Sequence, residues 1–271
     1  MKLIACLRIR NESWIINYTL SALSEFVDEI LIIDDGSEDE TVEICRSCPK
    51  VTEIVEKGIQ YDRKRNETAD WNSLAKMAVK RGADWIWGTD ADEMVEPKIK
   101  SEIQAMMSDP RAGLYRFRKV SPWKGLEYFR TDRSRFDHKA SDALNPVLVR
   151  AADCFYWPNP KGSFIESLAK RILRGDQLHQ IVGRIMPKGI AGEVINRDDL
   201  VCIHFNHVDF NKLIKRQIFY AINEKTDRPF RTNRDILDWA YKGIDETGME
   251  LAPVKKEWLW QDYLKSIIID K

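Results

Sequence analysis

The chain has 271 residues, 44% of them hydrophobic, and its 43 basic and 43 acidic residues give a formal net charge of zero. This length can form one large α/β domain, or a domain with an extension. The neutral balance gives no indication of a nucleic-acid-binding protein, and five sparse cysteines exclude a disulfide framework.

Strands and helices are expected to alternate over residues 1–107. Short apolar runs predict buried strands at 2–7, 29–34, 51–56 and 84–89. Apolar residues at helical spacing predict helices at 12–26, 66–83 and beyond Pro97. Ser37 and Glu40 have the spacing of a capping box, so a further helix is expected to begin there. This alternation favours a Rossmann-like, mostly parallel central sheet with helices on both faces.

The pattern is weaker after residue 108. Strands are predicted at 113–120, 145–150 and 200–205, and a helix at 210–225. The Trp-rich stretch from about 232 to 271 is expected to be a C-terminal helical extension.

Polar clusters follow three of the predicted strands. They read RIRNE (8–12), DDGSEDE (34–40) and DADE (90–93). Open sheets of this type bind ligands outside the carboxyl ends of their strands. The three segments are therefore expected to meet at one crevice.

Four carboxylates lie within seven positions of one another: Asp90, Asp92, Glu93 and Glu96. Two carboxylates about 4 Å apart repel by roughly 4 kcal/mol at an effective dielectric constant near 20. Asp90 and Asp92 could together approach a divalent cation, which would bridge them to a diphosphate. The alternative is a solvated acidic loop that caps the helix beginning at Pro97.

Several motifs, taken in order, resemble the family 2 glycosyltransferases. They are RNE (10–12), IIDDGSEDET (32–41), DWNSLAKMA (70–78), DADE (90–93) and CIHFNH (202–207). The resemblance implies the GT-A fold and an inverting transfer of a sugar from a nucleotide-diphosphate donor, UDP- or GDP-linked, to an acceptor hydroxyl. It covers residues 1–107 and 200–225 and is thin between them.

The resemblance also implies a set of nucleotide-binding residues: Arg8, Arg10, Asn11, Asp34, Asp35, Arg65 and Asp90. Asp35 is expected to hydrogen-bond the base with Asp34 close by, although Asp34 could instead cap its own turn. Arg8 and Arg10 replace the small residues or proline usual in the first loop. They could contact phosphate or form surface ion pairs.

The metal ligands implied by the resemblance are Asp92 and His204, with Asp90 facing the ribose and a metal-bound water. His207 is the fallback for His204, which could also be an ordinary core histidine. Histidine beside carboxylates suits Mn²⁺ better than Ca²⁺, and the expected cofactor is Mn²⁺ or Mg²⁺.

One carboxylate is expected to take the proton from the acceptor hydroxyl. Glu166 is the first candidate and Asp142 the second, with Asp137 and Asp153 as further possibilities. An ordinary surface role for Glu166 is the alternative.

Residues 111–135 are expected to bind the acceptor. This segment contains eight basic residues, two acidic ones and five aromatic ones. Trp123 and Tyr128 could stack on a sugar or a base, and the cations could hold an anionic acceptor on a glycan, a lipid or a nucleic acid. Alternatively, the aromatic residues belong to the core.

The expected organisation is one GT-A catalytic domain over 1–225 and an extension over 226–271. Residues 1–107 would bind the nucleotide sugar and 108–225 the acceptor. Competing hypotheses are a nucleotidyltransferase that makes sugar nucleotides, which the absence of glycine in RIRNES disfavours, and an inactive carbohydrate-binding protein of the same fold.

We expect a cytoplasmic monomer or homodimer. The first apolar run is too short for a signal peptide, and no apolar window approaches the roughly 18 residues that span a bilayer. Peripheral membrane contact through the stretch that contains Trp258 and Trp260 is an alternative to packing on the domain.

Overall fold

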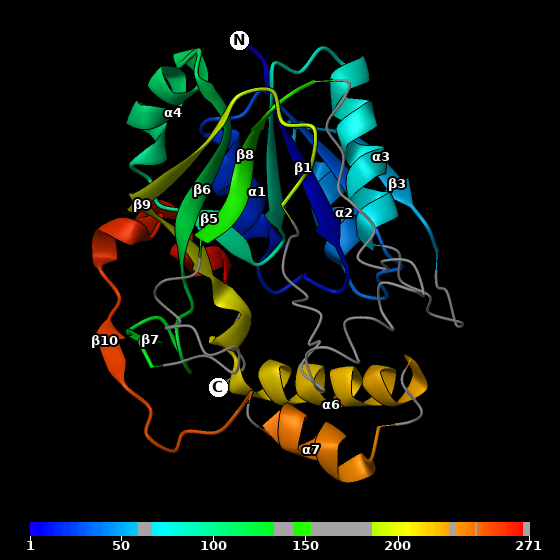
Figure 1. Ribbon diagram of the computed structural model, residues 1–271. Coiled ribbons are helices and arrows are strands. Elements are labelled where there is room, and N and C mark those ends of the chain that lie inside the picture. Colours follow the sequence, from blue (N-terminus) through cyan, green and yellow to red (C-terminus); the bar gives the residue numbers. More distant parts are fainter. Residues whose placement is uncertain (59–66, 133–143, 153–185, 228–230, 242, 268–271) are drawn as a thin grey trace, which may run out of the picture.

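A computed structural model describes residues 1–58, 67–132, 144–152, 186–227, 231–241 and 243–267. Its centre is an eight-stranded sheet in the order β3-β2-β1-β4-β8-β6-β9-β5 (Figure 1). These strands are β1 (Leu3–Ile9), β2 (Glu29–Asp34), β3 (Val51–Glu56), β4 (Trp85–Asp90), β5 (Glu93–Val95), β6 (Ala112–Val120), β8 (Leu144–Arg150) and β9 (Glu193–His204). A separate pair is formed by β7 (Tyr128–Arg130) and β10 (Leu251–Pro253).

The sheet is parallel in its first half and mixed in its second half. Strands β3, β2, β1 and β4 are all parallel neighbours. Strand β8 then pairs antiparallel with β4 and β6, β9 runs parallel to β6, and β5 is antiparallel to β9. The α/β class expected from the sequence is confirmed. The parallel half places the carboxyl ends of β1, β2 and β4 at one edge.

Helices cover both faces of the sheet (Figure 1). The α-helices of the described residues are α1 (Ile16–Ser24), α2 (Thr41–Ser47), α3 (Glu67–Lys80), α4 (Ile99–Ser108), α6 (Phe210–Asp227) and α7 (Asn233–Tyr241). Along β1, Ile4 and Cys6 pack in a cluster with Leu74 of α3, whereas Leu3 and Leu7 belong to the cluster on the opposite face. This is the alternation of a strand buried on both sides. Helices α6 and α7 lie across the end of the sheet to which β1 points.

The predicted capping box is wrong. Helix α2 begins at Thr41, and its N-cap residue Glu40 makes no side-chain capping hydrogen bond. The hydroxyl of Ser37 instead donates to Asp34, and Asp39 accepts from the backbone N–H of Thr41 at 3.1 Å. The side chains of Ser37 and Asp39 form hydrogen bonds within the turn in place of a capping box, a competition that is common for short polar side chains.

The C-terminal stretch is only partly helical. After α7 it contains β10 and two short 3₁₀ helices, η3 (Lys256–Trp258) and η4 (Gln261–Ser266). Trp258 and Trp260 are 8% and 6% exposed and belong to the core, so they pack on the domain. Within the ranges given above, no helix has both the length and the apolar character needed to cross a bilayer.

Trp260→Phe is expected to lower the free energy of unfolding by about 1–2 kcal/mol. The indole N–H of Trp260 donates to the backbone oxygen of Val95 at 2.8 Å, and phenylalanine has no donor to replace it. Urea unfolding measures the loss. Trp258→Phe is the matched control, because no hydrogen bond of its indole is seen among the described residues. Equal losses of unfolding free energy in the two variants would contradict a stabilising hydrogen bond from the indole of Trp260.

Candidate functional site

A tight turn between β4 and β5 carries Asp92 to the end of β9. In the antiparallel pairing of β5 with β9, Glu93 lies opposite His204. The backbone N–H of Phe205 donates to the backbone oxygen of Asp92 at 2.8 Å. The two residues that the resemblance implied as metal ligands are therefore brought together by a backbone ladder, although they lie more than a hundred residues apart in the sequence.

The side chain of Asp92 lies between a histidine and an arginine. Its Oδ1 is 3.4 Å from Nε2 of His204, and its Oδ2 is 3.4 Å from Nη2 of Arg216 on α6. Burial alone would raise the pKa of Asp92, but His204 and Arg216 outweigh it, and the pKa is lowered. The carboxylate is therefore ionised.

Glu12 is a half-buried carboxyl at the same site that the sequence did not single out. It follows β1, and its Oε2 accepts the indole N–H of Trp14 at 2.7 Å. Burial and the charge of Asp92 raise its pKa to about 8, against the opposing effect of Arg216. The signal in the sequence was the glutamate of RNE, directly beside the loop expected to line the nucleotide.

The other two carboxylates of the acidic cluster are used by the fold. Glu93 is 1% exposed and accepts from Nζ of Lys119 at 2.6 Å. Glu96 is 5% exposed and accepts the backbone N–H of Val201 at 2.7 Å. With Asp92 also buried, the alternative of a solvated acidic loop is wrong. Asp90, at the end of β4, is half-buried and acts electrostatically on Lys119.

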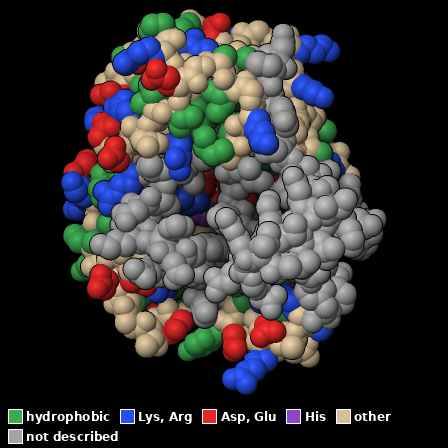
Figure 2. Space-filling model, in the orientation of Figure 1, with side chains coloured by type: hydrophobic (Ala, Val, Ile, Leu, Met, Phe, Trp, Pro, Cys, Tyr) green, Lys and Arg blue, Asp and Glu red, His purple; other side chains and the backbone are tan. Residues whose placement is uncertain are grey.

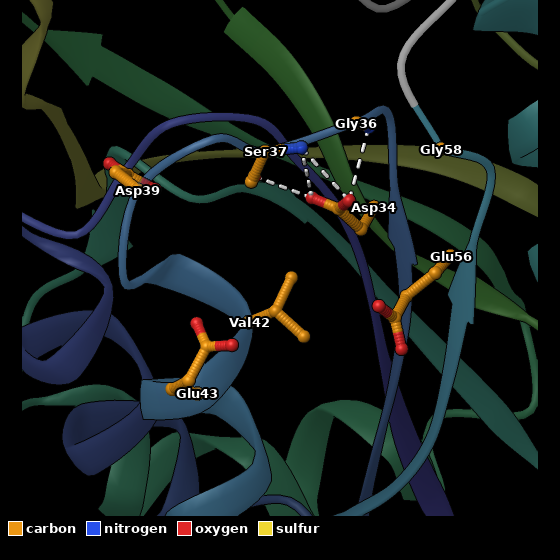
Figure 3. Close-up of a pocket in the computed structure, with 8 residues that line it drawn as sticks. All are labelled: Asp34, Gly36, Ser37, Asp39, Val42, Glu43, Glu56 and Gly58. Atoms are coloured by element: carbon orange, nitrogen blue, oxygen red, sulfur yellow. Dashed lines mark hydrogen bonds between the residues drawn. The ribbon is translucent and has the colours of Figure 1, made fainter.

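Asp34 holds the turn after β2. Its carboxylate accepts the backbone N–H groups of Gly36 and Ser37 at 3.1 and 3.0 Å, together with the hydroxyl of Ser37 (Figure 3). This is the turn-capping arrangement that the sequence left open.

A cavity of about 140 Å³ lies beside this turn, with these lining residues: Asp34, Gly36, Ser37, Asp39, Val42, Glu43, Glu56 and Gly58 (Figure 3). Half of them are acidic. Such a lining repels a diphosphate.

Arg8 joins three carboxylates from two other segments. Its guanidinium donates to Asp35 and Asp70 at 2.8 Å and to Glu67 at 2.9 Å. Lys57 forms an ion pair with Asp70 and lies 4.0 Å from Asp35. Of the two roles considered for Arg8, the ion-pair role is the one the structure shows, although the arginine side chain is only 13% exposed and the pairs are not superficial.

The neighbouring loop residues Arg10 and Asn11 differ in how they are held. Arg10 is half-buried and forms no ion pair with the described part of the chain. Asn11 has a left-handed backbone, with φ of 53°, which asparagine tolerates better than most residues. Its N–H donates to the hydroxyl of Ser37 at 2.9 Å, and its side-chain oxygen accepts from the N–H of Glu38 at 2.7 Å. The loop after β1 is thereby tied to the turn after β2.

Arg8→Lys is expected to lower the free energy of unfolding by about 1 kcal/mol, because an ammonium cannot reproduce the three-way geometry of the guanidinium. Chemical denaturation checks this value. Arg10→Lys is the matched control and should change stability by less than about 0.5 kcal/mol. A larger loss in the control than in Arg8→Lys would refute the structural role of the network.

The donor atoms at Asp92 and His204 fit one divalent ion. Two donors bound to the same ion at about 2.1 Å lie roughly 3.0 Å apart in octahedral and 3.4 Å apart in tetrahedral geometry. Oδ1 of Asp92 and Nε2 of His204 are 3.4 Å apart. Within the described residues, no group of three histidine, cysteine, aspartate or glutamate side chains could hold a metal. An ion here would need further oxygen ligands from a bound molecule or water.

His207 is half-buried, and its imidazole favours the neutral form. Burial, together with His204 and Arg216, lowers its pKa well below the ordinary value. Its ring lies 5.3 Å from that of Trp123, edge to face, and its Nδ1 has no hydrogen-bond partner in the described structure.

Four of the five aromatic residues in segment 111–135 are buried. Trp123 is 5% exposed, and its indole N–H donates to Glu246 at 2.9 Å, so its predicted stacking role is wrong. Tyr128 is 49% exposed and remains available. Many cations of the segment have partners, such as Arg130, which is paired with Asp132.

Some candidates lie outside the described residues: Arg65, Asp137, Asp142, Asp153 and Glu166. Their roles stay predictions.

On the face drawn in Figure 2, acidic side chains and a histidine lie at the bottom of a central hollow, beside Lys and Arg side chains.

Comparisons with known proteins give a family and several distant likenesses. The chain is 31% identical over 133 residues to the uncharacterized protein Rv3786c of Mycobacterium tuberculosis, and the match covers 47% of this chain and 32% of that protein. An uncharacterized protein of Mycobacterium bovis, Mb3815c, matches to the same extent. The chain thus spans about a third of the length of these curated relatives.

Solved structures are similar at low identity. S. aureus TarS 1–349 in complex with UDP is 13% identical, with a TM-score of 0.46, and the match covers 91% of this chain and 71% of that one. Glucosyl-3-phosphoglycerate synthase from Mycobacterium tuberculosis, in complex with Mn²⁺, UDP and glucosyl-3-phosphoglycerate, is 17% identical, with a TM-score of 0.34 and coverage of 44% of each chain.

The family model described as "Glycosyl transferase family 2" matches residues 6–168, which is more than half of the chain and includes β1, the turn after β2 and the acidic segment at Asp90 and Asp92. This chain therefore belongs to glycosyl transferase family 2.

Proposed function

We propose that the protein is a metal-dependent, inverting glycosyltransferase that moves a sugar from a nucleoside diphosphate to an acceptor hydroxyl. The observation that carries the proposal is the approach of an ionised Asp92 to the imidazole of His204 at the carboxyl end of the parallel strands. Membership of the family supplies the class of reaction.

In this proposal Asp92 and His204 hold Mn²⁺ or Mg²⁺, and Asp90 faces the ribose and a bound water. The ion supplies charge that stabilises the departing diphosphate. Arg216, whose guanidinium lies beside Asp92, adds a fixed positive charge at the same place. Asp35, with its carboxylate oriented by Arg8, would accept a hydrogen bond from the base.

Calorimetric titration of UDP, GDP, dTDP and CMP, each with and without Mn²⁺, tests the donor site. One nucleotide is expected to bind tightly and only with the metal, and its identity names the base. The acceptor search would then begin with hydroxyl compounds that carry a negative charge. If none of the nucleotides binds under any condition, the better hypothesis is a carbohydrate-binding protein of the same fold without transferase activity.

A further inference from the structure

Arg216 occupies one side of the carboxylate that is proposed to hold the metal. Its Nη2 faces Oδ2 of Asp92, while His204 faces Oδ1. Each oxygen of Asp92 thus already has a nitrogen neighbour. A divalent ion on Asp92 would lie within a few ångströms of the guanidinium, and two cations that close repel each other.

Arg216 is weakly held where it lies. Its contacts with Asp92 and with the backbone oxygen of Asn206 are both 3.4 Å, longer than the usual 2.9–3.0 Å of an N–H to oxygen hydrogen bond. Only 23% of its side chain is exposed, so water compensates its charge poorly. A half-buried guanidinium whose hydrogen bonds are long gains from a better anionic partner.

A diphosphate would be that partner. Guanidinium groups bind phosphate oxygens through paired, charge-assisted hydrogen bonds. The metal needs oxygen ligands as well, because Asp92 and His204 supply only two donors and the described residues offer no third. One diphosphate can therefore satisfy both cations and screen their repulsion.

We propose that Arg216 is the counter-ion of Asp92 in the free protein and moves to the diphosphate when metal and nucleotide bind together. Arg216 then opposes binding of metal alone and supports binding of metal with nucleotide. This role rests on the proposed function of the site. It makes the two ligands cooperative, because each removes an obstacle to the other.

Mn²⁺ binding and nucleoside diphosphate binding should change in opposite directions in Arg216→Gln. We expect Mn²⁺ alone to bind about tenfold more tightly than to the wild type, measured by electron paramagnetic resonance of the free ion. The nucleoside diphosphate that binds the wild type most tightly should bind about tenfold more weakly in saturating Mn²⁺, measured by calorimetry. Lys215→Gln, which removes an exposed charge from the neighbouring position of α6, is the matched control and should leave both affinities unchanged.

Arg216→Lys separates charge from geometry. It keeps the repulsion, so Mn²⁺ alone should bind as in the wild type, but it loses the paired hydrogen bonds, so the diphosphate should bind more weakly. This variant also covers the case in which Arg216→Gln fails to fold.

The outcomes distinguish the two proposals. In one outcome the wild type binds a nucleoside diphosphate, while Arg216→Gln binds Mn²⁺ and the nucleotide either as the wild type does or both more weakly. That result would overturn the role of Arg216 and leave the proposed function intact. Failure of the wild type to bind any nucleoside diphosphate would overturn the proposed function itself.

Discussion

Asp92→Asn is expected to slow turnover of the nucleotide sugar by about a hundredfold to a thousandfold. The substitution keeps the size and shape of the side chain and removes the negative charge that would balance a divalent ion. On a rate scale this corresponds to about 3–4 kcal/mol of lost transition-state stabilisation. Release of the nucleoside diphosphate, with water or a hydroxyl compound as acceptor, can be followed with Mn²⁺ at saturation.

The matched control for this experiment is Asp199→Asn. Asp199 lies on β9 with His204, but its side chain is 50% exposed and pairs with Lys98, outside the cluster around Asp92. Its turnover should equal that of the wild type. Circular dichroism checks that Asp92→Asn is folded, because the change leaves Arg216 without its counter-ion. Full turnover in folded Asp92→Asn would exclude the proposed metal role.

The parallel half of the fold could be predicted because its signals are local. Runs such as EILIID are buried on both faces, and each is bounded by polar turns. Once the strands are parallel, their carboxyl ends meet, and this predicts that the turn after β2 and the segment at Asp90 share an edge. The meeting of Asp92 with His204 needed the resemblance as well, because no periodicity links residues so far apart.

The features that the sequence did not predict depend on contacts between segments that are distant in the chain. Strand β5 has three residues and exists through its pairing with β9, so no pattern in DEMVE predicts it. The indole N–H of Trp123, a residue predicted to stack on an acceptor, donates to Glu246, 123 positions away. Trp260 likewise donates its backbone N–H to the hydroxyl of Tyr18, 242 positions away.

Arg8 shows why composition alone could not choose between two roles. An arginine in the loop after a strand can bind phosphate or carboxylate, and both choices use the same paired hydrogen bonds. In the structure the guanidinium of Arg8 pairs with the carboxylates of Asp35, Glu67 and Asp70. These residues lie in the turn after β2 and in the first turn of α3. The network fixes the position of Asp35.

Glu12→Gln is expected to stabilise the metal-free protein by about 3 kcal/mol above pH 8, less than the roughly 5 kcal/mol of the full shift because water screens a half-buried carboxylate, and to have little effect below pH 4.5. The folded protein raises the pKa of Glu12 from 4.5 to about 8, mainly through burial and the charge of Asp92. A carboxyl with a raised pKa is favourable in the fold only while it is protonated. The wild type should therefore lose stability as the pH rises from 4.5 to 8, and the neutral glutamine should abolish this loss.

Urea unfolding at pH 5, 7 and 8.5, with a chelator present and no nucleotide, measures the effect. Glutamine keeps the side-chain oxygen that accepts the indole N–H of Trp14, so the comparison isolates the charge. Glu38→Gln is the matched control, because Glu38 is exposed and its carboxylate has no hydrogen bond or ion pair within the described residues. If Glu12→Gln and the wild type have parallel stability profiles from pH 5 to 8.5, Glu12 does not carry a buried negative charge beside Asp92. The electrostatic picture of the site, in which the charge of Arg216 acts on both Asp92 and Glu12, would then need to be revised.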